Sequence, residues 1–222
     1  MGHVILAATG LKREARLIAR PGVVAIAGGG DATRLEAALE ARAESASALL
    51  SIGLAGALAE GLVPGDWVIG DATTPRWRDH LAMRLPRARI GSVFADGTMA
   101  FDAAVKRRLH TETDAIAVDM ETHVVKRVAE RRGLPLAILR VISDDVKRTL
   151  PPAARVGMRA DGGIALGAVL ASLILHPGQI PALVGVARDA SRGMRSLFRG
   201  YDMLARVGLV PPNLGKLPLD MA

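Results

Sequence analysis

The stretch VVAIAGGGDATRLEAALEARA, residues 23–43, points to the fold class. It opens on five apolar residues, 23–27, which is the length of a short buried strand. Three glycines follow, and then Asp31, a residue type that commonly caps the N-terminus of a helix. Apolar residues then recur at helical spacing to about Ala43. The stretch therefore predicts a strand, a glycine-rich turn and a helix in succession.

The same alternation continues on both sides of this unit. A helix is predicted over 11–19, and further strands at 4–8, 49–54, 67–70, 115–118 and 136–142. Strands that alternate with helices predict an α/β fold, in which a largely parallel or mixed sheet is covered by helices on both faces. Half of the 222 residues are apolar, so the chain can bury a substantial core as one large or two small domains.

Residue usage argues against several functional classes. The absence of cysteine excludes disulfides, a thiol nucleophile and zinc held by cysteine, and it fits a reducing compartment. The five histidines show no ligand-like spacing. Aromatic residues make up only 3%, too few for the stacked rings of many nucleic-acid-binding modules, and no nucleic-acid-binding motif is present. We therefore expect neither a metal site nor a nucleic acid partner.

The net charge of +7 is compatible with an anionic membrane surface or with an anionic small substrate such as phosphate. The arginines are scattered, which also fits an ordinary solvated basic surface. The apolar stretch near the N-terminus has only strand length and lacks the features of a signal peptide, so we expect a cytoplasmic protein. The longest apolar run, Ile164–Leu175, is too short to span a membrane and predicts a helix buried in protein.

Chemically informative residues follow several of the predicted strands. In α/β folds, sites lie beyond the carboxyl ends of the strands. Glu14 comes soon after the first strand, and the glycines 28–30 end the second. Later strands end in the clusters 119–121 (DME) and 143–145 (SDD). Each feature also has a purely structural explanation, as a turn, as an acid that complements a helix dipole, or as a helix cap. Together they predict an acidic site.

Four separated segments share the order and spacing of one superfamily, and they lie within residues 4–175. The segments are AVDME at 117–121, LRVISD at 139–144, SIGLAGAL at 51–58 and VPGDWV at 63–68. In these segments the chain resembles the nucleoside phosphorylase and 5′-methylthioadenosine/S-adenosylhomocysteine nucleosidase superfamily. The resemblance implies a three-layer fold with a mixed central sheet flanked by helices. It also implies an enzyme that cleaves the N-glycosidic bond between a purine base and ribose.

The resemblance also implies roles for individual residues. Met120 would lie against the ribose, and Glu121 would bind its hydroxyl groups, placing negative charge near the cationic sugar of the transition state. Asp144, oriented by Ser143, would protonate the departing base or donate a hydrogen bond to it. Phe101 is a candidate for contact with the base, and Phe94 and Met99 are the alternatives.

The residues leave two nucleophiles open. Glu14 occupies the position of the water-activating glutamate in the nucleosidase branch, which favours hydrolysis. Gly28, Gly29 and Gly30, together with Arg34, form a candidate phosphate cradle, which favours phosphorolysis with inorganic phosphate as co-substrate. No metal or organic cofactor is implied by either reaction.

A narrower resemblance, to the hopanoid-associated phosphorylases, rests on residues 115–121 and 176–183. It implies that adenine is released from adenosylhopane, a nucleoside linked to a lipid, in hopanoid biosynthesis. Two alternatives stay open. The first is a methylthioadenosine/S-adenosylhomocysteine-type nucleosidase or a purine nucleoside phosphorylase, and the second is a nucleoside-binding module without catalytic activity.

The C-terminal part of the chain, 176–222, is predicted to be a basic helical extension of a catalytic domain over 1–175. Its arginines at 188, 192, 195 and 199 share one helical face, with apolar residues around them. Such a helix, over 183–207, can lie on an anionic membrane and so place the protein at the inner membrane face. The alternative is that it packs on its own domain or on a neighbouring subunit. The resemblance also implies a homo-oligomer.

Overall fold

The computed structural model describes residues 4–155, 163, 165–211 and 214. In this part of the chain, the centre is one mixed sheet in the order β2-β1-β3-β8-β4-β5, with β7 paired to β3 and β6 paired to β7. The strands are β1 Ile5–Thr9, β2 Val23–Ala27, β3 Ala48–Ala57, β4 Trp67–Gly70, β5 Arg89–Gly91, β6 Val93–Ala95, β7 Ala117–Asp119 and β8 Leu136–Asp144. The predicted α/β fold with a mixed central sheet is confirmed.

Strand directions bring several strand ends to one edge of the sheet. The strands β2, β1, β3 and β8 run parallel, as expected for buried, almost wholly apolar strands. β7 pairs antiparallel with the end of β3, and β4 pairs antiparallel with β8. The register between β3 and β8 shifts at Gly56, which lies opposite Asp144. This irregularity, where β3 meets both β7 and β8, re-aims the side chains that follow.

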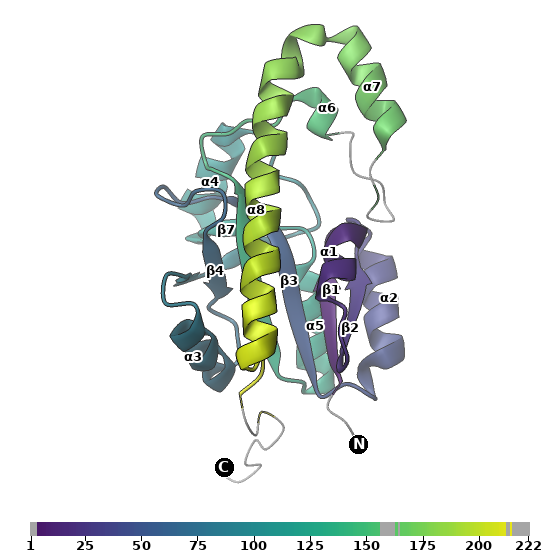
Figure 1. The fold of residues 1–222 in the computed structure, drawn as a ribbon, viewed down its shortest axis with the longest axis vertical. Helices are drawn as coiled ribbons and strands as arrows, with labels where there is room; N and C mark the ends of the chain where they lie inside the picture. Colours follow the sequence, from purple (N-terminus) through teal and green to yellow (C-terminus); the bar gives the residue numbers. More distant parts are fainter. Residues whose placement is uncertain (1–3, 156–162, 164, 212–213, 215–222) are drawn as a thin grey trace.

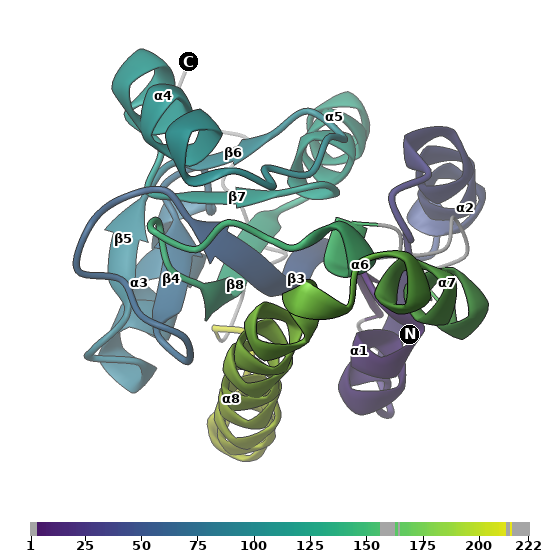
Figure 2. The same cartoon turned by 90° about the horizontal axis from the view of Figure 1, so that it is seen from above.

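Helices cover both faces of the sheet, so the molecule has three layers (Figures 1 and 2). α1, α3 and α8 share one core with β1, β3 and β8, whereas α2 and α5 pack on the opposite face. The helices are α1 Lys12–Ile18, α2 Ala32–Ala43, α3 Pro75–Arg84, α4 Ala103–Thr113, α5 Thr122–Arg132, α6 Pro152–Arg155, α7 Leu166–Leu175, the short 3-10 helix η1 Pro177–Gln179 and α8 Ile180–Val207. The flanking layers therefore agree with the prediction.

The long C-terminal helix α8 contributes to the main core. Leu197, Tyr201 and Leu204 are buried against the sheet, and the Tyr201 hydroxyl donates to the Ile18 carbonyl at 2.7 Å. The predicted division of the chain after residue 175 stays a prediction, but the C-terminal half of α8 packs on its own domain. The basic face of α8 is exposed at Arg188, Arg192, Arg195 and Arg199.

The helix α7 corrects one expectation. It was expected to be buried in protein, but Leu170, Ile174 and Leu175 are 59%, 81% and 73% exposed, while Ile164, the first residue of the predicted apolar run, lies outside the described residues. Figure 1 shows why: α7 and the first turns of α8 form a hairpin that projects from the body of the molecule. Within the described residues, no single helix is long and apolar enough to cross a membrane. One pair of helical segments, 169–175 and 177–207, has the length and composition of a membrane span when taken together, but the two segments are bent by 114°.

Candidate active site

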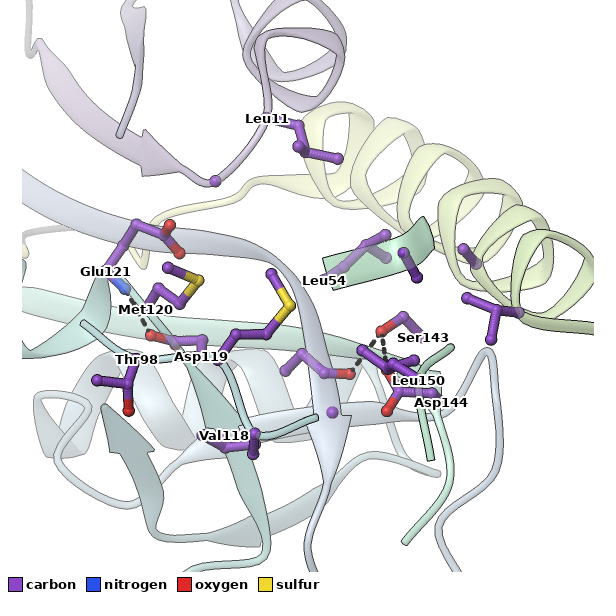
Figure 3. Close-up of a pocket in the computed structure, with 18 of the residues that line it drawn as sticks. Leu11, Leu54, Thr98, Val118, Asp119, Met120, Glu121, Ser143, Asp144 and Leu150 are labelled. Carbon is purple, nitrogen blue, oxygen red and sulfur yellow. Dashed lines mark hydrogen bonds between the residues drawn. The ribbon is translucent and has the colours of Figure 1, made fainter. Parts of the chain in front are cut away.

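A pocket of about 300 Å³ opens where the ends of β3, β7 and β8 meet. α1 and α8 also contribute to its wall. It is lined by Gly10, Leu11, Glu14, Leu54, Ala55, Gly56, Thr98, Met99, Ala100, Val118, Asp119, Met120, Glu121, Ser143, Asp144, Leu150, Ala154, Val186 and Ala190. Figure 3 shows Met120 and Glu121 on one side and Ser143 and Asp144 on the other. Five predicted site residues from three distant segments, Glu14 among them, therefore share one cavity.

Glu14 enters the pocket from the first turn of α1 and is almost completely buried. Its Oε2 accepts the backbone N–H of Leu11, and its Oε1 accepts the backbone N–H of Leu54, both at 2.8 Å. Burial raises the pKa of Glu14, while these hydrogen bonds and the positive charge of Arg140 oppose the rise. The carboxyl group is thus fixed in position, and a carboxylate with a raised pKa is a stronger base.

Glu121 lies directly after β7 and faces Glu14 across Gly10. A Cβ atom on Gly10 would lie 3.3 Å from Oε1 of Glu121 and 3.4 Å from Oε2 of Glu14. Burial, and next the negative charge of Asp119, raise the pKa of Glu121 to about 8; Glu14 adds to the rise and Arg140 opposes it. At neutral pH this cluster therefore retains a proton that a solvated glutamate would release.

Asp119 positions Glu121 through the backbone. Its Oδ1 accepts the N–H groups of Glu121 and Thr122, each at 2.8 Å. Its Oδ2 lies on the guanidinium group of Arg140, which is fully buried in β8 and also donates to the hydroxyls of Ser51 and Thr122. The sequence indicated Asp119 as part of the acidic cluster 119–121, and Arg140 only as part of a matching segment. The available signal for Arg140 was a charged residue in the middle of an otherwise apolar strand.

Asp144 ends β8 at the other side of the pocket. The Ser143 hydroxyl lies 2.6 Å from Oδ1 of Asp144 and 3.1 Å from the Ala55 carbonyl, so Ser143 orients the carboxylate as expected from the resemblance. Oδ2 accepts a hydrogen bond from Nζ of Lys106, which is fully buried in α4. Sequence reasoning missed Lys106, because it lies in the run Lys-Arg-Arg and looks like part of a solvated helix face.

The predicted phosphate cradle is not formed. The N–H groups of Gly28 and Gly29 donate to the carbonyls of Thr9 and Gly10, at 2.7 and 2.9 Å, and Gly28, Gly29, Gly30 and Arg34 do not line the pocket. Gly28 instead allows close packing, because a Cβ there would come within 2.9 Å of Cγ of Glu121. The side chain of Arg34 donates to the Gly28 carbonyl at 2.7 Å. These glycines support the position of Glu121.

The position of the base-contacting residue is also corrected. Phe101 does not line the pocket; its carbonyl accepts the N–H of Leu150 at 2.8 Å. Thr98, Met99 and Ala100, which immediately precede it, line the pocket in its place. Met99, one of the alternatives predicted for this loop, therefore reaches the cavity, and none of the three residues that line it here is aromatic.

The pocket combines an acidic set of side chains with an apolar wall. Glu14, Asp119, Glu121 and Asp144 line it, and none of the described lining residues is basic. Among the described residues, no group of three or more histidine, aspartate or glutamate side chains has the arrangement to hold a metal ion. The arrangement is suited to binding sugar hydroxyls, to stabilising positive charge, and to donating to or accepting from a polar base.

Comparisons with known proteins agree with this fold. A model of the Phosphorylase superfamily matches residues 72–174, somewhat less than half of the chain. No curated protein sequence matches.

Solved structures with the same fold include an S-adenosylhomocysteine nucleosidase from Streptococcus pyogenes, with a TM-score of 0.64, 15% identity, and coverage of 91% of this chain and 98% of that one. The futalosine hydrolase of Helicobacter pylori has a TM-score of 0.63 and 14% identity, with coverage of 93% of this chain and 99% of that one. The 5′-methylthioadenosine/S-adenosylhomocysteine nucleosidase of the same organism has a TM-score of 0.59 and 15% identity, with coverage of 90% of this chain and 98% of that one. At this identity the matches show the fold.

Proposed function

We propose that this protein is an enzyme that cleaves the N-glycosidic bond of an adenine nucleoside. The observation that carries the proposal is that Glu14, Glu121 and Asp144, which come from three distant segments of the chain, line one pocket. Cleavage of this bond leaves positive charge on the ribose and negative charge on the base, so it needs carboxylates near the sugar and a proton or hydrogen-bond donor near the base. The pocket provides both kinds of group at its two ends.

The proposed roles follow from position. Glu121 accepts the ribose hydroxyls, and Met120 packs against the sugar ring. Asp144, held by Ser143, faces the purine and donates to it as the bond breaks. Glu14 lies beside Glu121, and its raised pKa favours taking a proton from the nucleophile.

We propose water rather than phosphate as the nucleophile. Phosphate binding needs cations or free backbone N–H groups. The described lining residues include no cation, four of them are acidic, and the N–H groups of Gly28 and Gly29 are used within the protein. Glu14, in contrast, lines the pocket, and we assign it the role of general base. The reaction proposed is hydrolysis to adenine and a free sugar, with no cofactor.

The preferred substrate class is a 5′-substituted adenine nucleoside such as methylthioadenosine or S-adenosylhomocysteine. The fold is shared with nucleosidases named for these compounds, over at least 90% of this chain. The superfamily match over 72–174 covers Asp119, Glu121 and Asp144. A purine nucleoside phosphorylase and a binding module without activity are less well supported, because the first needs a phosphate site and the second needs no Glu14.

A second candidate substrate is adenosylhopane, and the apolar wall of the pocket favours it. Leu54, Leu150 and Val186 line one side, and Val186 belongs to the helix whose first turns form the projecting hairpin. Apolar side chains thus extend from the pocket wall along α8 toward the exposed Ile174 and Leu175. A lipid attached at the ribose 5′ position would find an apolar environment there.

This candidate includes contact of a cytoplasmic homo-oligomer with the inner membrane face. The predicted contact segment was 183–207, but its C-terminal half packs in the core. Phe198 and Val207 are exposed within that half, but most of the exposed apolar residues lie earlier, in α7 and the first turns of α8. The nearest exposed arginines, Arg188 and Arg192, follow these along α8. Apolar side chains beside cations suit an anionic lipid surface.

The experiment that tests the reaction identifies the sugar product. Purified protein is incubated with methylthioadenosine in ¹⁸O-labelled water, with and without inorganic phosphate. The proposal predicts a sugar that carries ¹⁸O at C1, at a rate that does not depend on phosphate, and a loss of about 100-fold or more in Glu14→Gln. A sugar 1-phosphate as the main product would overturn hydrolysis and would leave bond cleavage standing. Adenosylhopane assayed in parallel tests the second candidate, which falls if only the soluble nucleoside is cleaved.

A further inference from the structure

Lys106 is a buried cation that the roles above do not use. It lies in the first turn of α4 and is fully buried. Its Nζ donates to Oδ2 of Asp144, to the Asp145 carbonyl at 3.0 Å and to the Arg148 carbonyl at 3.1 Å. These three acceptors use all three N–H bonds of the ammonium group. Burying a charged lysine costs free energy, even when all its N–H groups are hydrogen-bonded. The charge of Lys106 lies next to one carboxylate of the pocket, that of Asp144.

The same region joins α4 to the loop that follows β8. The Ala103 N–H donates to the Thr149 hydroxyl at 3.2 Å, and the Leu150 N–H donates to the Phe101 carbonyl at 2.8 Å. Leu150 itself lines the pocket. Lys106 therefore holds the carboxylate and the loop beside it from behind, without reaching the cavity.

Asp144 is held on both oxygens. Ser143 donates to Oδ1, Lys106 donates to Oδ2, and Gly56 leaves the space that the carboxylate fills, since a Cβ there would lie 3.3 Å from Oδ2. Among the described residues, Lys106 is the only cation within ion-pair distance of Asp144. The orientation of this carboxylate thus depends on two neighbours, of which only Lys106 is charged.

We propose that Lys106 is a positioning residue for departure of the base, and this rests on the proposed function. When Asp144 gives its proton to the purine ring nitrogen, the electrons of the glycosidic bond go to the base and a carboxylate remains. The Lys106 ammonium stabilises that carboxylate and fixes its direction. Its effect is confined to leaving groups that need a proton, because Lys106 contacts neither the sugar side of the pocket nor Glu14.

The test compares two substrates that share one sugar and differ in the leaving group. One is methylthioadenosine, whose adenine needs a proton to leave; the other is the 4-nitrophenyl riboside with the same 5′ group, whose nitrophenolate leaves without one. Lys106→Met is expected to lower kcat for the adenine nucleoside by about 100-fold, with little change in KM, and to lower kcat for the nitrophenyl riboside less than about threefold. Lys126→Met, an exposed lysine on α5, is the matched control and should change neither. Equal losses on both substrates in Lys106→Met would overturn the inference.

Two further variants keep the test decisive if Lys106→Met folds poorly. The double variant Lys106→Met, Asp144→Asn removes both charges, so no unpaired charge remains buried. It should be no slower on the adenine nucleoside than Asp144→Asn alone, whereas additive losses would contradict an action through Asp144. Because the chain has no cysteine, Lys106→Cys can be aminoethylated in denaturant and refolded, which restores an ammonium group at this position only. Recovery of adenine release is expected, and recovery of the fold without activity counts against the inference.

The wild-type protein separates the two levels of failure. If it turns over neither substrate and releases no adenine from adenosylhopane, the proposed function is wrong and this inference falls with it. If it turns over both and Lys106→Met loses both equally, only the role of Lys106 is wrong.

Discussion

Replacing Glu121 with glutamine should stabilise the protein at alkaline pH and leave it almost unchanged at acid pH. The pKa of Glu121 is raised from 4.5 to about 8, first by burial and next by Asp119. Between these values the unfolded chain releases a proton that the folded protein keeps, so wild-type stability falls as the pH rises and the loss is complete above pH 8. Glutamine binds no proton and escapes this loss.

The size of the effect follows from the same shift. From pH 5 to pH 8 the difference grows over three units, at about 1.4 kcal/mol per unit. Relative to wild type, the free energy of unfolding of Glu121→Gln should therefore rise by about 4 kcal/mol between pH 5 and pH 8.5. Urea unfolding followed by tryptophan fluorescence at the two pH values measures this difference.

A matched control comes from a glutamate whose pKa is shifted the other way. Hydrogen bonds from Arg131 and Arg127 lower the pKa of Glu36, so it is ionised in the folded protein throughout this range. The stability it contributes is present above its unfolded pKa and is lost only as the pH falls through its lower folded pKa. Glu36→Gln should differ from wild type by nearly the same amount at pH 6.5 and pH 8.5. An equally flat difference for Glu121→Gln would refute the reasoning about the acidic cluster.

Three further predictions follow from the packing. Gly28→Ala puts a Cβ within 2.9 Å of Cγ of Glu121, so it should raise KM for the nucleoside about tenfold in steady-state assays, with or without phosphate. A rise in KM seen only with phosphate present would support a phosphate site at these glycines. Arg140→Met leaves buried carboxylates unpaired and should lower the free energy of unfolding by about 3–5 kcal/mol in urea titrations, whereas an unchanged midpoint would contradict the ion-pair network. Ile174→Ser should weaken binding to anionic liposomes about tenfold, while Met83→Ser, a change at another exposed apolar residue, on α3, should not. Equal sedimentation of both variants with liposomes would count against membrane contact. If the wild type instead dimerises with rising concentration and Ile174→Ser does not, the hairpin binds a second copy of the chain.

The fold could be predicted from sequence because its central strands are apolar almost throughout and are followed by turn residues. The predicted strands 23–27 and 136–142 lie in the sheet, the second as most of β8. The extension of β3 to Ala57 was underestimated, because its glycines and alanines carry little strand signal of their own. Tertiary pairing with β7 and β8 supplies what the local sequence lacks.

The position of the site could be predicted for the residues that follow the ends of strands. Glu14, Glu121 and Asp144 follow strand ends, and strand ends converge in this class of fold. The glycines 28–30 were misleading, because a glycine-rich turn before a helix looks the same whether its N–H groups face a ligand or the neighbouring turn. In this structure Gly28 and Gly29 donate to the neighbouring turn.

The buried lysine was beyond the reach of sequence patterns. Lys106 lies in a basic, amphipathic stretch, and only the packing of α4 shows that this one lysine points inward. The exposure of α7 was missed for the opposite reason: an uncharged apolar helix is usually buried, and no pattern within 164–175 indicates that it projects from the body. Both depend on contacts between segments far apart in the chain.

The most direct test of the central claim is the release of free adenine from methylthioadenosine, followed by chromatography, for wild type and Asp144→Asn, with Asp79→Asn as a control on the exposed surface of α3. The account predicts adenine release by wild type and by Asp79→Asn, and a loss of about 100-fold or more in Asp144→Asn. Equal rates in all three proteins would contradict the assignment of the pocket, and no release from this or any other adenine nucleoside, adenosylhopane included, would contradict N-glycosidic cleavage itself.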